Sequence, residues 1–236
     1  MTSHAVRRLR RAWDVLIGPA VDAAVHRQWR RFSLAAVAAL AVFGLGCAYR
    51  TPAGHAFIEA YAITRPGDGW ATVALRLPLS MFAPAALLPF WFAVLQVALV
   101  YGLAQPILGW WRTVVAAVVG HVLATCSAHL WILLGRPFGV GHGYDTFGDA
   151  GPSVAVVAVI AYVAVACRAY WLAGVLAAYD TAEIMVFNGL SQREHLLGVL
   201  AGAACAGAGR FVATRRPALA DPAGASVAAD PAGASA

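Results

Sequence analysis

Six long runs of apolar residues constrain this chain more than any other feature of its sequence. Hydrophobic residues make up 61% of the chain and charged residues only 12%, about half the charged share of an ordinary soluble protein. A chain this poor in charge lacks the polar side chains needed to cover a water-exposed surface. Backbone groups in lipid must pair within their own segment, so each run is predicted to be a helix. We therefore predict an all-α polytopic membrane protein with six transmembrane helices, near residues 32–49, 81–105, 112–134, 152–167, 169–188 and 195–209.

The segments outside these runs divide the chain into three parts. Residues 1–31 are basic and carry an apolar stripe at helical spacing, which predicts an amphipathic helix at the membrane surface, ended or kinked at Pro19. A solvated basic tail explains the same residues equally well. Residues 32–209 form the predicted membrane domain. Residues 210–236 contain a repeated Asp-Pro-Ala-Gly-Ala-Ser motif and are predicted to be a disordered cytoplasmic tail.

The distribution of arginine predicts the orientation in the membrane. With the N-terminus inside, the inner segments hold twelve Arg and the outer loops hold five, as the positive-inside rule requires. Both termini of this predicted plasma-membrane protein are then cytoplasmic. The net charge of +6 is explained by contact with the lipid bilayer, and we predict no nucleic-acid partner. The long loop 50–80 lies outside and is expected to contain interfacial structure.

Two polar residues are predicted to lie at similar depth near the outer surface. Ser153 is in the first turn of run 152–167, and His195 begins run 195–209. Gly198 and Gly202 share the face of His195 and permit close approach of a neighbouring helix. A serine beside a histidine can act as nucleophile and general base, and the free N–H groups of a helix start can stabilise an oxyanion. The competing interpretation is structural, since Ser is a common N-cap residue and Gly stripes are common in membrane helices.

The remaining polar residues predict no metal site and no cofactor. His121 and His129 are eight residues apart and diverge around their helix. Asp180 and Glu183 lie near the outer end of their run and are interpreted as a loop end or cap. The four cysteines are interpreted as small packing residues, because none forms a CxxC pair: Cys47, Cys126, Cys167 and Cys205.

The two helix starts resemble the catalytic motifs of rhomboid intramembrane serine proteases. The first is Gly151-Pro-Ser153 and the second is the His-x-x-Gly-x-x-x-Gly pattern from His195 to Gly202. Six helices and a long first outer loop match the bacterial members, and Asp149-Ala-Gly-Pro-Ser153 is most similar to divergent actinobacterial rhomboid-like proteins. The resemblance implies a serine endopeptidase that cleaves transmembrane protein substrates, with Ser153 as nucleophile and His195 as general base.

The chain also departs from the pattern of that family. Val154 follows the serine where the family has Gly, and run 81–105 lacks the family's His and Asn. Gln96 is the amide at plausible depth there, and Gly151 is the other residue expected to support an oxyanion site. The alternative is therefore a catalytically inactive rhomboid-like protein that binds transmembrane helices of client proteins. The sequence predicts no oligomeric state.

Overall fold

The computed structural model describes residues 10–84, 89–138, 144 and 148–215. Within these ranges the regular structure is helical, apart from one isolated antiparallel bridge between Thr64 and Asp149. The predicted all-α class is therefore confirmed. Residues 10–16 are also helical, and 3₁₀ turns cover Trp29–Phe32 and Arg136–Phe138. The named α-helices are α2 (Gly18–Val25), α3 (Ser33–Ala48), α4 (Pro52–Tyr61), α5 (Trp70–Ser80), α6 (Phe90–Leu108), α7 (Trp110–Gly135), α8 (Ser153–Ala166), α9 (Tyr170–Phe187) and α10 (Leu190–Arg215).

Three of the described helical segments are long and apolar enough to cross a membrane. They are Trp29–Ala48, Phe90–Leu108 and Trp110–Gly135. Large apolar side chains lie on the outside of these segments, for example Leu40, Phe43 and Trp91. A water-soluble bundle would cover such groups, whereas lipid solvates them. The segments are thus compatible with a membrane protein.

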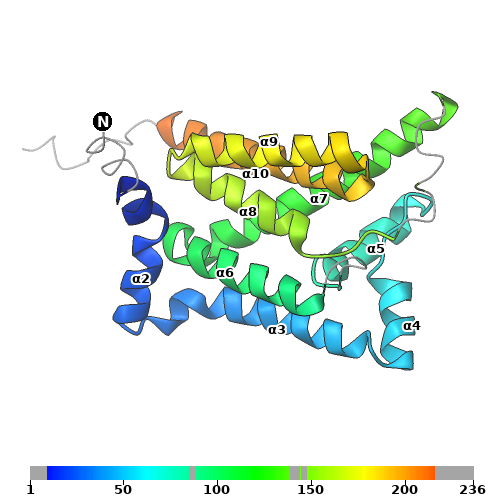
Figure 1. Cartoon of the computed structure of the whole chain (residues 1–236), viewed down its shortest axis with the longest axis horizontal. Coiled ribbons are helices and arrows are strands. Elements are labelled where there is room, and N and C mark those ends of the chain that lie inside the picture. Colours follow the sequence, from blue (N-terminus) through cyan, green and yellow to red (C-terminus); the bar gives the residue numbers. More distant parts are fainter. Residues whose placement is uncertain (1–9, 85–88, 139–143, 145–147, 216–236) are drawn as a thin grey trace, which may run out of the picture.

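The bundle is layered around α8. Figure 1 shows α9 and α10 on one side, α3 on the opposite side, and α8 and α6 between them. Nine of the fourteen residues of α8 are buried, and the helix packs against α6, α7, α9 and α10. This short helix therefore stands inside the bundle. Helices α4 and α5 lie together at the end of the bundle where α8 begins (Figure 1).

Several predicted boundaries are wrong. The helix predicted from residue 81 begins only at Phe90, because Pro89 lacks an N–H and stands at the N-cap. The loop 50–80 does contain structure, in the form of α4 and α5. Pro19 lies in the first turn of α2, after a turn at Ile17 interrupts the preceding helix.

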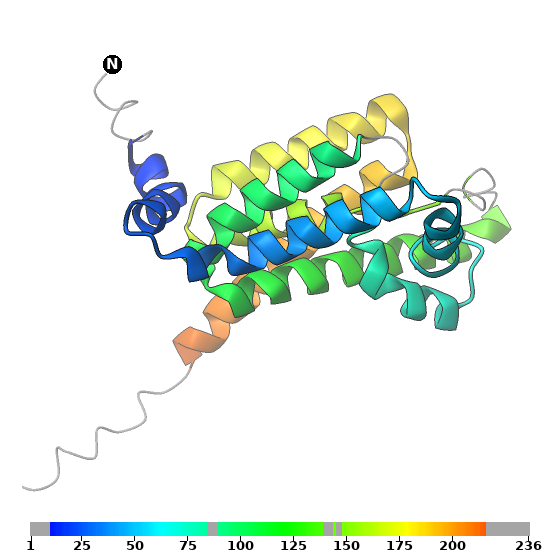
Figure 2. The same ribbon diagram turned by 90° about the horizontal axis from the view of Figure 1, so that it is seen from below.

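The last helix is longer than predicted at both ends. It begins at Leu190, so His195 lies in its second turn rather than at its start, and it continues to Arg215 inside the predicted tail. Figure 2 shows this end of α10 extending beyond the neighbouring helices. Polar residues in the first turn and a Gly-Ala-rich end lowered the local hydropathy without preventing helix formation. The remainder of the predicted tail, 216–236, lies outside the described residues.

Glycines allow α10 and α8 to approach closely. A Cβ on Gly202 would lie 2.1 Å from the backbone oxygen of Ala158, and one on Gly198 would lie 3.0 Å from that of Val154. The contact at Gly202 is too short for any larger residue without a shift of the backbone, and the contact at Gly198 is tight enough that its neighbour would have to move by a few tenths of an ångström. The predicted glycine stripe on α10 therefore does face α8.

Candidate functional site

The segment that leads into α8 determines where Ser153 lies. Gly151 has φ = 138°, a conformation that other residues rarely adopt. Its N–H donates to the Ser80 carbonyl oxygen at 2.9 Å. Pro152 occupies the N-cap, and no side chain caps the helix. Ser153 is therefore the first residue of α8 and not its cap, which leaves its hydroxyl available for another partner.

That partner is His195. The Nε2 atom of His195 lies 2.8 Å from Ser153 Oγ, which is a normal hydrogen-bond distance. Both residues are half-buried. The contact joins the second turn of α10 to the first turn of α8. Along α10 it comes just before Gly198 and Gly202, which contact the same helix. The structure thus brings the two predicted residues together, while their catalytic roles stay a prediction.

The N-terminus of α8 offers backbone donors beside the serine. The first helical bond to a carbonyl outside α8 runs from Val156 N–H to Pro152 O at 2.9 Å. The N–H groups of Ser153, Val154 and Ala155 precede it and have no intrahelical acceptor. Such groups point along the helix axis and carry the positive end of its dipole. They can stabilise negative charge that develops near Ser153 Oγ.

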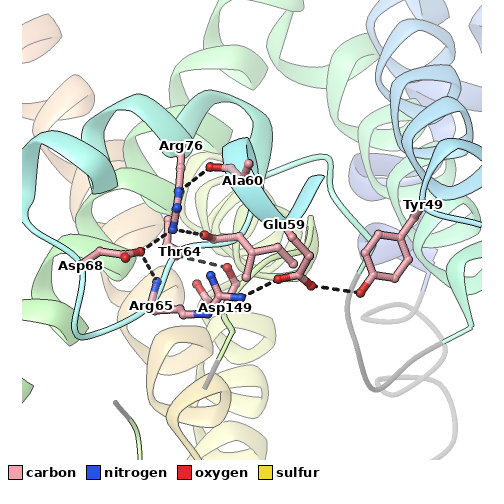
Figure 3. Close-up of polar contacts among 9 residues, drawn as sticks. Tyr49, Glu59, Ala60, Thr64, Arg65, Asp68, Arg76 and Asp149 are labelled. Carbon is pink, nitrogen blue, oxygen red and sulfur yellow. Dashed lines mark hydrogen bonds and ion pairs between the residues drawn. The ribbon is translucent and has the colours of Figure 1, made fainter. Parts of the chain in front are cut away.

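The loop 50–80 is joined to the segment before Ser153 through backbone pairing. Thr64 and Asp149 exchange two backbone hydrogen bonds of 3.0 and 2.8 Å, and the Thr64 hydroxyl also donates to Asp149 O. Figure 3 shows this pair beside a network of charged side chains from α4, α5 and their connection. Arg76 is the centre of that network, donating to Asp68 at 2.7 Å and to the carbonyl oxygens of Ala60 and Ile63.

A second ion pair completes the network. Arg65 contacts Glu59 at 2.5 Å, and the Tyr49 hydroxyl donates to the other Glu59 oxygen (Figure 3). The arrangement ties the end of α3, the whole loop 50–80 and the strand-like segment before α8 into one unit. It thereby connects the loop 50–80 to the segment that precedes α8.

Two carboxyl groups also link the serine and histidine segments. Asp149 lies four residues before Ser153, Glu194 directly precedes His195, and their side chains are hydrogen-bonded to each other. Burial raises the pKa of the Asp149 carboxyl, and the hydrogen bond from Glu194 acts in the opposite direction. Two carboxyl groups in this contact must share a proton, because two carboxylates would repel.

The other predicted site residues have different positions. Gln96 is half-buried on α6, and among the described residues no hydrogen bond joins it to Ser153 or His195. Gly151 supports the site by its conformation, but its N–H is already engaged by Ser80 and is not an oxyanion donor here. Of the groups considered, the N–H groups at the start of α8 remain the candidate oxyanion donors.

Sequence reasoning missed two features. A second Ser–His pair lies inside the bundle, where Ser80 Oγ is 2.8 Å from His121 Nε2. Asp180, interpreted as a loop end or cap, is instead buried next to His195, and Glu183 lies with them. The spacing of Asp180 and Glu183, three residues apart on one helix, did indicate a shared face. Only the packing of α9 on α10 shows what that face meets.

Comparisons with known proteins add no relative to this description: none of the protein-family models, curated proteins or solved structures matches the chain. The described residues form a helical protein with three helices long and apolar enough to cross a membrane and a half-buried Ser–His pair between two packed helices.

Proposed function

We propose that this chain is an intramembrane serine protease of the rhomboid kind, with six membrane spans and both termini in the cytoplasm. The observation that carries the proposal is the 2.8 Å contact between Ser153 Oγ and His195 Nε2. The substrate class is a transmembrane segment of another protein, unwound near the outer surface so that a peptide carbonyl reaches Ser153.

The described residues support a complete acyl-transfer cycle. His195 Nε2 accepts the hydroxyl proton as Ser153 Oγ attacks the carbonyl carbon, and the N–H groups at the start of α8 stabilise the oxyanion. The imidazolium then returns the proton to the leaving amine, which departs and leaves an acyl-serine. Water attacks the ester with His195 again taking a proton, and Ser153 leaves with that proton. No other group is required to balance these steps.

The six-span arrangement rests on helix length and burial. α9 has 18 residues, or about 27 Å at 1.5 Å per residue, close to the roughly 30 Å of a bilayer core. α8 has 14 residues and is enclosed by its neighbours, so it need not match the lipid thickness. α10 has 26 residues and is long enough to cross.

The proposal is tested by covalent labelling of the purified full chain in detergent with a fluorophosphonate. Wild-type protein should label at Ser153, identified by peptide mass spectrometry. Ser153→Ala and His195→Ala should abolish the label, and Ser80→Ala is the matched control because it removes a hydroxyl from the other Ser–His pair. Labelling that survives both substitutions at the candidate site would overturn the proposal.

A second candidate is a non-catalytic protein that binds client helices. The observation that favours it is a cavity of about 460 Å³ between α3, α5, α6 and α7, with an apolar lining that includes Leu34, Leu77 and Val118. Such a space accepts apolar side chains of a transmembrane segment or an acyl chain. Binding of a transmembrane peptide without cleavage, unaffected by Ser153→Ala and weakened by Ala117→Phe in this cavity, would favour this candidate.

A further inference from the structure

The outward-facing helix α9 has one buried residue, and that residue is an acid. All 18 residues of α9 are described, and Asp180 alone is buried, at 1% exposure. Apolar neighbours such as Trp171, Val175 and Met185 are exposed instead. In lipid, exposed apolar side chains are expected, but burying a carboxylate still carries a large desolvation cost unless a partner compensates it. The orientation of α9 therefore needs a specific polar reason.

The polar environment of Asp180 contains Glu183 and His195. One carboxylate oxygen from each acid and one ring nitrogen of His195 all lie within 4.8 Å of one another. The Oδ2 atom of Asp180 is buried and has no hydrogen-bond partner among the described residues. Glu183 accepts a hydrogen bond from the Tyr179 hydroxyl at 2.6 Å, which orients its carboxylate.

Apart from His195 itself, no basic side chain in the described part of the chain forms a salt bridge with these two acids. The salt bridges there involve neither Asp180 nor Glu183. Arg193, the arginine nearest in sequence, donates to the carbonyl oxygens of Asn188 and Gly189 and lies over the Trp131 ring. Buried carboxylates are ordinarily paired with a cation or coordinated to a metal. A bound cation would balance this cluster.

We propose that Asp180, Glu183 and His195 form a binding site for a divalent transition-metal ion such as Zn²⁺. Carboxylate oxygens and imidazole nitrogens are both zinc ligands, and a site with three protein ligands leaves the fourth position open. A point equidistant from three atoms separated by 4.8 Å lies about 2.8 Å from each, so a closure of about 0.7 Å per ligand gives zinc bond lengths of about 2.0–2.2 Å. Side-chain rotation of Glu183, which is half-buried, can supply much of this closure.

A metal ion bound at this site would prevent His195 from acting as the general base for Ser153. This inference rests on the proposed function. If the metal binds Nδ1, the Nε2 atom must carry the ring proton and donates to Ser153 Oγ. It then cannot accept the serine proton. If the metal binds Nε2, the contact with Ser153 is replaced. Either mode removes the general base, so the metal acts as a reversible inhibitor.

Zinc binding is tested first without reference to activity. The full chain in detergent is stripped with a chelator and titrated with buffered Zn²⁺, and bound metal is measured by equilibrium dialysis with elemental analysis. Wild-type protein and Ser153→Ala should each bind one zinc. Asp180→Asn and Glu183→Gln should weaken binding by at least the roughly 10- to 100-fold lost with an outer-shell partner.

Matched controls separate this site from other zinc ligands. Asp22→Asn changes an exposed acid that contacts His26 at 3.0 Å, and Cys47→Ser removes an exposed thiol. Neither should change the affinity for zinc. Wild-type binding below one zinc per chain, or unchanged binding in both Asp180→Asn and Glu183→Gln, overturns the metal site.

The inhibitory role is tested by labelling. Zinc should suppress fluorophosphonate labelling of wild-type Ser153, a chelator should restore it, and Glu183→Gln should shift the required zinc concentration upward by the same factor as its binding constant. Labelling that is insensitive to zinc at full occupancy overturns the inhibitory role. Absence of any labelling refutes the proposed protease, whereas zinc binding by Ser153→Ala still tests the site.

Discussion

The molecule contains two Ser–His pairs with the same 2.8 Å contact and different surroundings. Ser80 is fully buried and His121 is 2% exposed, whereas Ser153 and His195 are half-buried. Ser80 Oγ donates to the Leu77 carbonyl oxygen at 3.0 Å. A hydroxyl has one proton, so His121 Nε2 must donate to Ser80 and cannot take a proton from it.

The comparison shows that distance alone does not identify a nucleophile. Ser153 begins a helix, so backbone N–H groups lie beside it, and His195 is its hydrogen-bond partner among the described residues. Ser80 is the last residue of α5, where carbonyl groups rather than N–H groups are left over. The direction of the hydrogen bond, the access and the helix end all favour Ser153. Ser80 and His121 together join α5 to α7 inside the bundle.

The largest expected effect is a loss of proteolytic activity on substitution of Ser153 or His195 but not of Ser80. Ser153→Ala or His195→Ala should lower peptide-bond hydrolysis of a transmembrane substrate by at least about 10⁴-fold, as for serine proteases whose nucleophile or base is removed. Ser80→Ala should leave the rate unchanged, because its carbonyl contact with Gly151 remains. Cleavage of a reporter in proteoliposomes measures all three. Equal losses of the hydrolysis rate in Ser80→Ala and Ser153→Ala would contradict the different roles assigned to the two Ser–His pairs.

The next effect tests whether close packing of α8 and α10 holds the candidate pair together. Gly202→Ala places a Cβ 2.1 Å from Ala158 O, so the helices must separate, at a cost near the upper end of about 1–3 kcal/mol. In this variant both the fluorophosphonate labelling of Ser153 and the thermal midpoint should decrease. Gly207→Ala is the matched control, since no atom lies within 4 Å of its added Cβ; it should be neutral or slightly stabilising.

Substitution in the interior pair Ser80–His121 should change the stability of the protein but not its activity. Ser80→Ala leaves His121 Nε2 without its partner in the bundle interior, a loss of about 1 kcal/mol or slightly more. The thermal midpoint in detergent should fall while fluorophosphonate labelling of Ser153 persists. A variant with an unchanged midpoint would show that the interior hydrogen bond contributes little to stability.

The smallest effect concerns the carboxyl contact that links the segments of Ser153 and His195. Burial raises the pKa of Asp149 above its ordinary value of 3.8, so folding favours the protonated form. The associated stability is fully present below the unfolded pKa and is lost as the pH rises through the folded pKa. Asp149→Asn should flatten the decline of the thermal midpoint as the pH rises above about 4. An identical pH profile in wild type and variant would contradict this assignment.

The sequence predicted most of the helices because apolar content is a local property. The runs near 32–49, 112–134, 152–167 and 169–188 match α3, α7, α8 and α9 within a few residues. The errors occur where local hydropathy misleads. Met81 and the residues after it are apolar but precede Pro89, and the start of α10 is polar but helical.

Part of the candidate site was also predicted from local properties of the sequence. Spacing along α10 places His195, Gly198 and Gly202 on one face, and the six spans predicted from the sequence put Ser153 and His195 at the same end of their helices. Asp180 could not be assigned in this way, because its position near the end of a run is equally suited to a loop. The same is true of Ser80 and His121, which are 41 residues apart on different helices.

By itself the sequence determined that the chain is helical and apolar, since hydrophobicity and backbone pairing act within each segment. Only the tertiary structure decided which polar side chains meet. Helix faces are selected by contacts between segments far apart in the chain, and those contacts are set by steric fit at residues such as Gly202 and Ala158. The contacts among the Ser153 hydroxyl, the His195 imidazole and the buried Asp180 carboxyl therefore depend on the packing of separate helices, which no single segment encodes.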